Sequence, residues 1–192
     1  AYHGYNYLLA RENLTDPLSK DEREKKIRQR LWKIRAKKVI IATGSIERPL
    51  IFNNNDRPGI MLSSAIKKFI DFYGVKAGKK VSLFTNNDSA YETAISLKKS
   101  GVNIVSIIDI RDKSSSRIIE ETENLNIKIY WKHTVVNTEG YKRIRFIEIM
   151  QLSDDGSGVI GKKIKLKSDC LGISGGWTPM VHLFTQSGGK LK

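Results

Sequence analysis

Residues 81–97, VSLFTNNDSAYETAISL, constrain the fold of this chain more than any other stretch. The first residues form an apolar run of strand length, and a short polar turn follows. The remaining residues carry apolar side chains at helical spacing. A strand that passes through a tight turn into a helix is the opening unit of a parallel α/β sheet. The sequence therefore predicts a parallel sheet with helices packed against it.

The segments that follow repeat this pattern and then change it. We predict strands over residues 80–85, 103–109 and 127–131 and helices over 89–100 and 114–124, which is the βαβαβ half of a doubly wound sheet. An earlier helix is expected in LSSAIKKFIDFYG, capped by Ser63 or Ser64 and stopped at Gly74. An antiparallel β-meander should follow, with strands over 134–138, 142–151 and 160–167 and a turn at SDDGSG.

The turn after the first of these strands lacks the glycines that a dinucleotide-binding turn requires. Thr85, Asn87 and Ala90 stand where three glycines normally form the bend, admit the pyrophosphate and let the helix pack closely. The β-branched Thr85 should crowd the space of a pyrophosphate. Asp109 ends the next strand, near the place of a ribose-binding acid. We interpret this unit as a scaffold, and an altered anion site at the helix N-terminus stays open.

The residues before residue 60 predict a second body of structure. Residues 5–14 and 28–36 read as a hairpin, and a turn is expected at Asp16-Pro17. Val39–Ile41 form a β-branched run typical of a strand buried on both faces of a parallel sheet, and the run ends in Ala42, Thr43 and Gly44.

The expected domain boundaries follow from these segments. The breaker-rich linker NNNDRPGIM suggests a boundary near Pro58, and SDCLGISGG reads as another buried strand ending in a glycine pair. We predict a first nucleotide-binding domain over 1–57, an inserted Rossmann-like domain over 58–167 and a return into the first domain over 168–192. The chain starts at Ala1 and ends in SGGKLK, so we expect a piece of a longer polypeptide.

Composition narrows the class of protein. No apolar run approaches the roughly 20 residues that span a bilayer, so we expect no membrane association. A chain with one cysteine is typical of a reducing compartment, and we expect a cytoplasmic location. The single Cys170 and three scattered histidines do not suggest a disulfide framework or a metal site. The net charge of +14 comes from basic residues spread along the chain, many alternating with apolar ones. We interpret them as solvated faces or partner-subunit contacts rather than a nucleic-acid site, which only the charge supports.

Several longer strings resemble known flavoproteins. VIIATGSIERP resembles the element that leads from the first to the second nucleotide domain in thioredoxin-reductase-like and glutathione-reductase-like proteins, and SGGWTP resembles the point of return. RQRLWKIRAKKVIIATGSIERPLIFNNNDRPGIML, TNNDSAY and SGGWTPMVHLFTQSGGKL together resemble the alpha-subunit family of heterotetrameric sarcosine oxidases. The resemblance covers essentially the whole chain and implies a two-dinucleotide-binding-domain, Rossmann-like α/β fold.

The resemblance also implies a function for the parent protein. It implies an enzyme that oxidatively demethylates sarcosine to glycine, with hydrogen peroxide as a product and one-carbon transfer to tetrahydrofolate. FAD would lie on the beta subunit, FMN at the alpha/beta interface, and NAD in the alpha subunit, held mainly by residues outside this chain. The partners would be the beta, gamma and delta subunits, and the segment alone would be catalytically inactive.

The same resemblance implies six cofactor-binding residues, at the two elements that connect the domains. They are Ala42, Thr43, Gly44, Gly175, Gly176 and Trp177. For each, an ordinary turn or packing role remains an alternative. Arg48 is expected to form an ion pair with Glu47 or another acid rather than to bind phosphate.

We predict no catalytic residue in the chain. Cys170 should be an inert buried thiol, and His182 a packed or partner-facing side chain. The alternatives are an NAD(P)H-dependent disulfide or ferredoxin reductase domain, disfavoured because Cys-x-x-Cys is absent, and the alpha subunit of a related amine or opine oxidase.

Overall fold

The computed structural model describes residues 1–16, 18, 19, 22 and 26–191. It divides into two compact units, one of Ala1–Ile46 with Pro179–Lys192 and one of Glu47–Thr178. The chain passes between them at β4 (Ser45–Glu47) and β13 (Trp177–Pro179), which pair as a two-stranded sheet. The division into 1–57, 58–167 and 168–192 stays a prediction. The expected Asp16-Pro17 turn includes Pro17, which lies outside the described residues.

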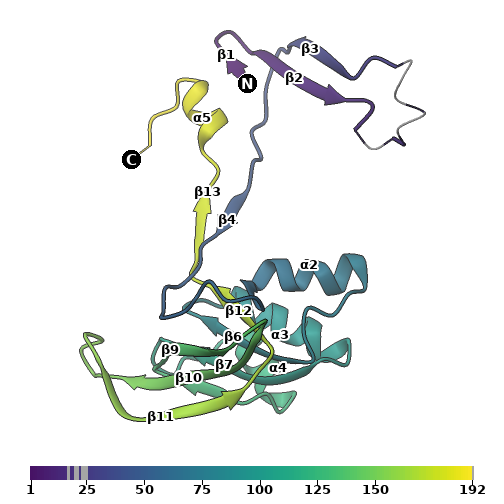
Figure 1. The fold of residues 1–192 in the computed structure, drawn as a ribbon. Helices are drawn as coiled ribbons and strands as arrows, with labels where there is room; N and C mark the ends of the chain where they lie inside the picture. Colours follow the sequence, from purple (N-terminus) through teal and green to yellow (C-terminus); the bar gives the residue numbers. More distant parts are fainter. Residues whose placement is uncertain (17, 20–21, 23–25, 192) are drawn as a thin grey trace. The chain divides into compact units, whose positions relative to one another are not determined.

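The second unit is built on a parallel five-stranded sheet, as the βαβαβ pattern predicts (Figure 1). Its order is β5-β12-β6-β7-β8, and every neighbouring pair is parallel. The strands are β5 (Ile60–Leu62), β12 (Cys170–Ser174), β6 (Lys80–Thr85), β7 (Asn103–Asp109) and β8 (Ile129–Trp131). The predicted strands 80–85 and 103–109 match their observed bounds.

Helices cover one face of this sheet. They are α2 (Ser63–Tyr73), α3 (Ser89–Lys99) and α4 (Arg117–Asn124). Tyr91 and Leu97 of α3 and Ile66 of α2 pack with Val81 and Leu83 of β6 in one buried cluster. Residues 81 and 83 share a face because successive strand side chains alternate.

An antiparallel meander covers the opposite face. Its order is β11-β10-β9, and its strands are β9 (His133–Gly140), β10 (Ile144–Leu152) and β11 (Val159–Lys167). Ile147 and Ile149 of β10 pack in a second buried cluster with Phe84 and Ile108 of the parallel sheet. The meander and its SDDGSG turn are therefore confirmed, with the Ser153 N–H donating to the Gly158 carbonyl at 2.9 Å.

The start of α2 differs from the prediction. Neither Ser63 nor Ser64 caps the helix; the N-cap position is Leu62, which makes no side-chain cap. The Ser64 N–H instead donates to the buried carboxylate of Glu47 at 2.8 Å, so an acid from β4 satisfies the helix end. The predicted stop at Gly74 is confirmed, since this residue adopts the left-handed conformation with φ of 64°.

The first unit contains the predicted hairpin. β2 (Tyr7–Asn13) pairs antiparallel with β3 (Gln29–Arg35), and β1 (Tyr2–His3) extends the sheet. The short helix α5 (His182–Gln186) lies beside β1, where the Tyr2 N–H donates to the Gln186 side chain at 2.8 Å.

The prediction of a buried strand at Val39–Ile41 is wrong for this structure. These residues are not in a strand, and Ile40 is 92% exposed. A strand needs paired neighbours, and the described residues place none beside this run.

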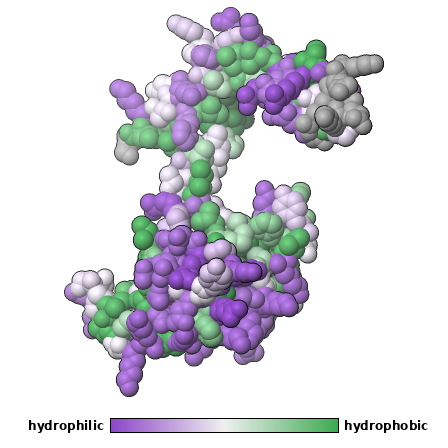
Figure 2. Space-filling view, viewed as in Figure 1, coloured by the Kyte–Doolittle hydropathy of each residue, from purple (hydrophilic) through white to green (hydrophobic). Residues whose placement is uncertain are grey.

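The surface of the second unit is largely polar on the face seen in Figure 2. Along β11 the basic residues alternate with apolar ones, as expected: Lys163 and Lys165 are exposed, whereas Ile164 and Leu166 pack against the core. Within the described part of the chain, no helix is both long and apolar enough to cross a membrane.

Candidate functional site

The turn after β6 is closed by its own first residue. Thr85 is fully buried, and its hydroxyl accepts the Asn87 N–H at 3.0 Å and donates to the Asn87 carbonyl at 2.9 Å. The Asn86 N–H donates to the Ser174 carbonyl at the end of β12, at 3.2 Å. Two backbone donors of the turn are therefore already satisfied within the chain.

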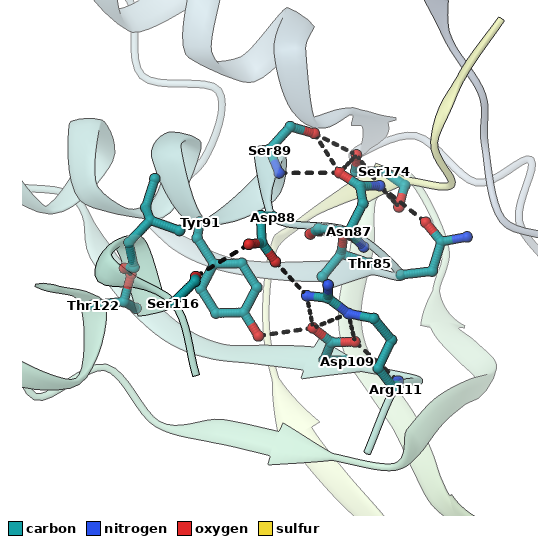
Figure 3. Close-up of polar contacts among 12 residues, drawn as sticks. Thr85, Asn87, Asp88, Ser89, Tyr91, Asp109, Arg111, Ser116, Thr122 and Ser174 are labelled. Atoms are coloured by element: carbon teal, nitrogen blue, oxygen red, sulfur yellow. Dashed lines mark hydrogen bonds and ion pairs between the residues drawn. The ribbon is translucent and has the colours of Figure 1, made fainter. Parts of the chain in front are cut away.

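The side chain of Asn87 fills the rest of the turn (Figure 3). Its Nδ2 donates to the carbonyl and the hydroxyl of Ser174, both at 3.1 Å. Its Oδ1 accepts the Ser89 N–H at 3.0 Å and also the Ser89 hydroxyl. An amide oxygen thus lies at the N-terminus of α3, where a bound phosphate would accept the same N–H.

These contacts decide whether the turn fits a dinucleotide. The N–H groups of Asn86, Asn87 and Ser89 all have partners in the chain. A pyrophosphate would have to displace those partners, and the glycines that let the backbone approach it are absent. The residues of this turn therefore do not fit the group.

Asp109 at the end of β7 is also committed to the protein. Its carboxylate is buried, accepts the Arg111 Nε at 3.1 and 3.2 Å and the Nη2 at 2.8 Å, and accepts the Tyr91 hydroxyl at 2.8 Å. Arg111 also reaches Asp88 at 2.8 Å, and the Ser116 hydroxyl donates to that same carboxylate at 3.1 Å. The acid that stands near the place of a ribose-binding residue therefore anchors an internal network (Figure 3).

The electrostatics of this network keep its members in one protonation state. Burial, and then the neighbouring Asp109 charge, raise the pKa of Tyr91, so the phenol stays a neutral donor. The hydrogen bond to Asp109 raises the pKa of Arg111, which stays cationic. Sequence reasoning missed Arg111, although its spacing of two residues from Asp109 placed both side chains on one side of the extended chain.

The first predicted triplet, Ala42, Thr43 and Gly44, lies in the first unit and is exposed. The Thr43 hydroxyl donates to the carbonyl of Met180, and the Met180 N–H donates to the Gly44 carbonyl at 2.9 Å. Gly44 has a φ of 67°, a conformation that favours glycine. These contacts account for the turn, and a cofactor role for the triplet stays a prediction.

The second predicted group, Gly175, Gly176 and Trp177, lies in the second unit. The Gly175 N–H donates to the Arg48 carbonyl at 2.6 Å, and a Cβ on Gly175 would lie 2.8 Å from the Pro49 carbonyl oxygen. Only glycine allows this close approach of the two chains. The first group lies in the first unit and the second group in the second unit, and a cofactor site that uses both stays a prediction.

Trp177 lies beside the start of α3. Its indole N–H donates to the Ser89 hydroxyl at 3.1 Å, and 42% of the residue is exposed. Its ring borders a pocket of about 180 Å³ that Glu47, Ser64 and Thr93 also line. The structure thus places Trp177 next to the Asn87 turn, which the sequence did not predict.

Arg48 differs from its prediction as well. Within the described ranges it makes no ion pair, and Glu47 is instead bound to the N-terminus of α2. Arg48 makes a backbone contact instead: its N–H donates to the Gly176 carbonyl at 2.8 Å.

Cys170 should resist alkylation in the folded chain. The thiol is fully buried, and burial raises its pKa to about 11. At mildly alkaline pH we expect iodoacetamide to label it at the rate at which the chain unfolds, and rapidly in denaturant. Mass spectrometry reads this directly, since the chain has one cysteine. Rapid stoichiometric labelling of the native chain would contradict this assignment.

Comparisons with known proteins give the family. No family model matches the chain. It is 36% identical over 186 residues, 97% of its length, to the protein named sarcosine oxidase subunit alpha from Corynebacterium sp. (strain U-96). It is 34% identical over 168 residues to the protein of the same name from Rhizobium meliloti (strain 1021), which covers 84% of the chain. The chain belongs to the sarcosine oxidase alpha-subunit family. It spans 19% and 15% of the lengths of these two relatives.

Solved structures confirm the predicted fold class. The chain superposes on a T. acidophilum thioredoxin reductase with a TM-score of 0.64 and 23% identity, covering 83% of this chain and 51% of that one. A FAD-dependent pyridine nucleotide-disulphide oxidoreductase from Desulfovibrio vulgaris gives a TM-score of 0.58 and 16% identity, covering 85% and 41%. At these identities the likeness supports the two-dinucleotide-binding-domain, Rossmann-like α/β fold alone.

Proposed function

We propose that this chain is a framework segment of the alpha subunit of a multi-subunit oxidoreductase of the sarcosine oxidase type. The whole enzyme would demethylate sarcosine oxidatively to glycine, release hydrogen peroxide and pass the one-carbon unit to tetrahydrofolate. The support is the name shared by the relatives, which match 84–97% of the chain. The reaction itself would use a flavin or nicotinamide cofactor, because side chains alone do not carry out such redox chemistry.

The role of this segment within that enzyme follows from the filled turn. The N–H groups that would hold a pyrophosphate are bound to Thr85, Asn87 and Ser174, and Asp109 is bound to Arg111. This observation carries the proposal. The βαβαβ unit would act as a rigid support, and it would not be the primary nucleotide site.

The remaining assignments are proposals from the resemblance. Ala42, Thr43, Gly44, Gly175, Gly176 and Trp177 would border NAD that residues outside this chain mainly hold. FAD and FMN would belong to the complete complex, together with the beta, gamma and delta subunits, in the cytoplasm. A related amine or opine oxidase alpha subunit is the nearest alternative. A disulfide reductase domain is less favoured because the chain has a single cysteine.

Calorimetric titration of the 192-residue chain with NAD⁺ tests the framework role. We expect no saturable binding up to millimolar NAD⁺. The backbone N–H groups that would bind the phosphates already donate to groups of Thr85, Asn87 and Ser174. Far-UV circular dichroism should show that the chain is folded in the same buffer. Saturable binding at micromolar NAD⁺ would contradict the proposal.

A further inference from the structure

A cluster of cations surrounds two adjoining pockets at the amino ends of β6 and β12, the ends opposite the Asn87 turn. The pockets have volumes of about 510 and 500 Å³ and share Arg145 and Asp169. Six exposed cations line them, and we call this surface the basic groove. They are Lys79, Lys80, Lys142, Arg143, Arg145 and Lys167.

The one carboxylate in the basic groove does not neutralise it. The Asp169 carboxylate accepts the backbone N–H groups of Lys79 and Lys80 at 3.1 and 2.9 Å. It therefore binds the backbone at the start of β6 and, among the described residues, forms no ion pair with a cation of the groove. The Arg143 guanidinium donates to the carbonyls of Asp169 and Ala77. Within the described ranges, no ion pair involves any of the six cations.

Several cations elsewhere on the same unit are paired with carboxylates. Lys163 lies 3.2 Å from Glu148, and Lys165 lies 2.5 Å from Glu139, both across the meander. Lys132 lies 2.6 Å from Asp154. The basic groove concentrates six cations, without ion pairs in the described part of the chain, around one carboxylate, and such a surface attracts an anionic partner.

The chemistry of the basic groove favours an acidic peptide over a single-stranded nucleic acid. Single-stranded nucleic acids bind basic grooves in which several aromatic rings stack successive bases. Here the lining contains two rings, Tyr141 and Phe146, and the Lys165 ammonium lies 4.6 Å from the centre of the Phe146 ring. One ring is free to stack. Carboxylates need no such platform, and exposed Lys and Arg pair with them directly.

We propose that the basic groove binds an acidic segment of a partner protein. Carboxylates of the partner would neutralise the cations of the basic groove, which have no ion-pair partners within the described residues of this unit. The proposal rests on the charges of the second unit and is independent of the proposed enzyme and of NAD binding.

Binding of a ten-residue polyglutamate peptide to the 192-residue chain tests the proposal. We expect binding at low salt that weakens as salt rises, because exposed charge pairs are screened. The groove variant Lys80→Gln/Arg145→Gln/Lys167→Gln should bind about tenfold more weakly. The control Lys68→Gln/Lys98→Gln/Lys162→Gln removes the same charge from exposed positions of the same unit outside the groove, and should bind within about twofold of the parent.

Each other outcome overturns the proposal. If both variants bound the peptide equally weakly, the peptide would be attracted by net charge alone. If the parent chain did not bind the peptide at low salt, the groove would not be a binding site for acidic segments. A ten-nucleotide single-stranded DNA that binds more tightly than the peptide, and loses affinity in the groove variant, would identify a nucleic-acid surface instead. Thermal unfolding should show that both triple variants remain folded.

Discussion

Replacing Asp109 by asparagine should lower the free energy of unfolding by about 2–4 kcal/mol. The carboxylate is fully buried and holds the Arg111 guanidinium and the Tyr91 hydroxyl. An amide keeps the shape but loses the charge, and it leaves Arg111 with Asp88 as its remaining acid. We place the effect below that of a completely buried pair, since the Arg111 side chain is 32% exposed. Urea unfolding followed by circular dichroism measures the change.

Asp112→Asn is the matched control for this experiment. The Asp112 side chain is 86% exposed, and its ion pair with Lys132 spans 3.6 Å. The same chemical change three residues away should therefore alter the free energy of unfolding by less than about 0.5 kcal/mol. If the two variants unfold alike, Asp109 is not the anchor of the network, and its carboxylate could serve a ligand.

The contrast between β6 and Val39–Ile41 shows what the sequence could predict. Residues 80–85 and 103–109 were predicted within their observed bounds because the apolar runs, the turn and the helix spacing all agree. Val39–Ile41 has the same β-branched character, yet Ile40 is 92% exposed. An apolar run favours burial, but it forms a strand only where neighbouring strands pair with it. The pattern of residues along the chain does not show which strands become neighbours.

The candidate site was predictable in outline and not in its contacts. The missing glycines at Thr85 and Asn87 indicated a turn unsuited to pyrophosphate. The sequence did not show that the Asn87 amide would lie on the N-terminus of α3, because this depends on Ser174, which is 87 residues away. The position of Asp109 near the place of a ribose-binding acid did not show that its carboxylate binds Arg111, because the sequence shows Arg111 only as a nearby charge.

Replacing Asn87 by alanine should lower the free energy of unfolding by about 2–3 kcal/mol. One side chain accepts the Ser89 N–H and donates to the Ser174 carbonyl. Its removal leaves the Ser89 N–H without this partner and leaves the Ser174 carbonyl with the Asn86 N–H. The Thr85 hydroxyl would remain bound to the residue 87 backbone, which keeps the turn itself in place. Chemical unfolding measures the loss.

Asn86→Ala is the control, because it makes the same substitution one residue earlier. The Asn86 side chain accepts one hydrogen bond, from Asn87 Nδ2 at 2.9 Å, and its backbone N–H keeps its bond to Ser174. We expect a loss of about 1 kcal/mol or less. A smaller effect at Asn87 than at Asn86 would mean that the Asn87 side chain does not hold the turn. Phosphate could then displace it, and the framework role would lose the observation that carries it.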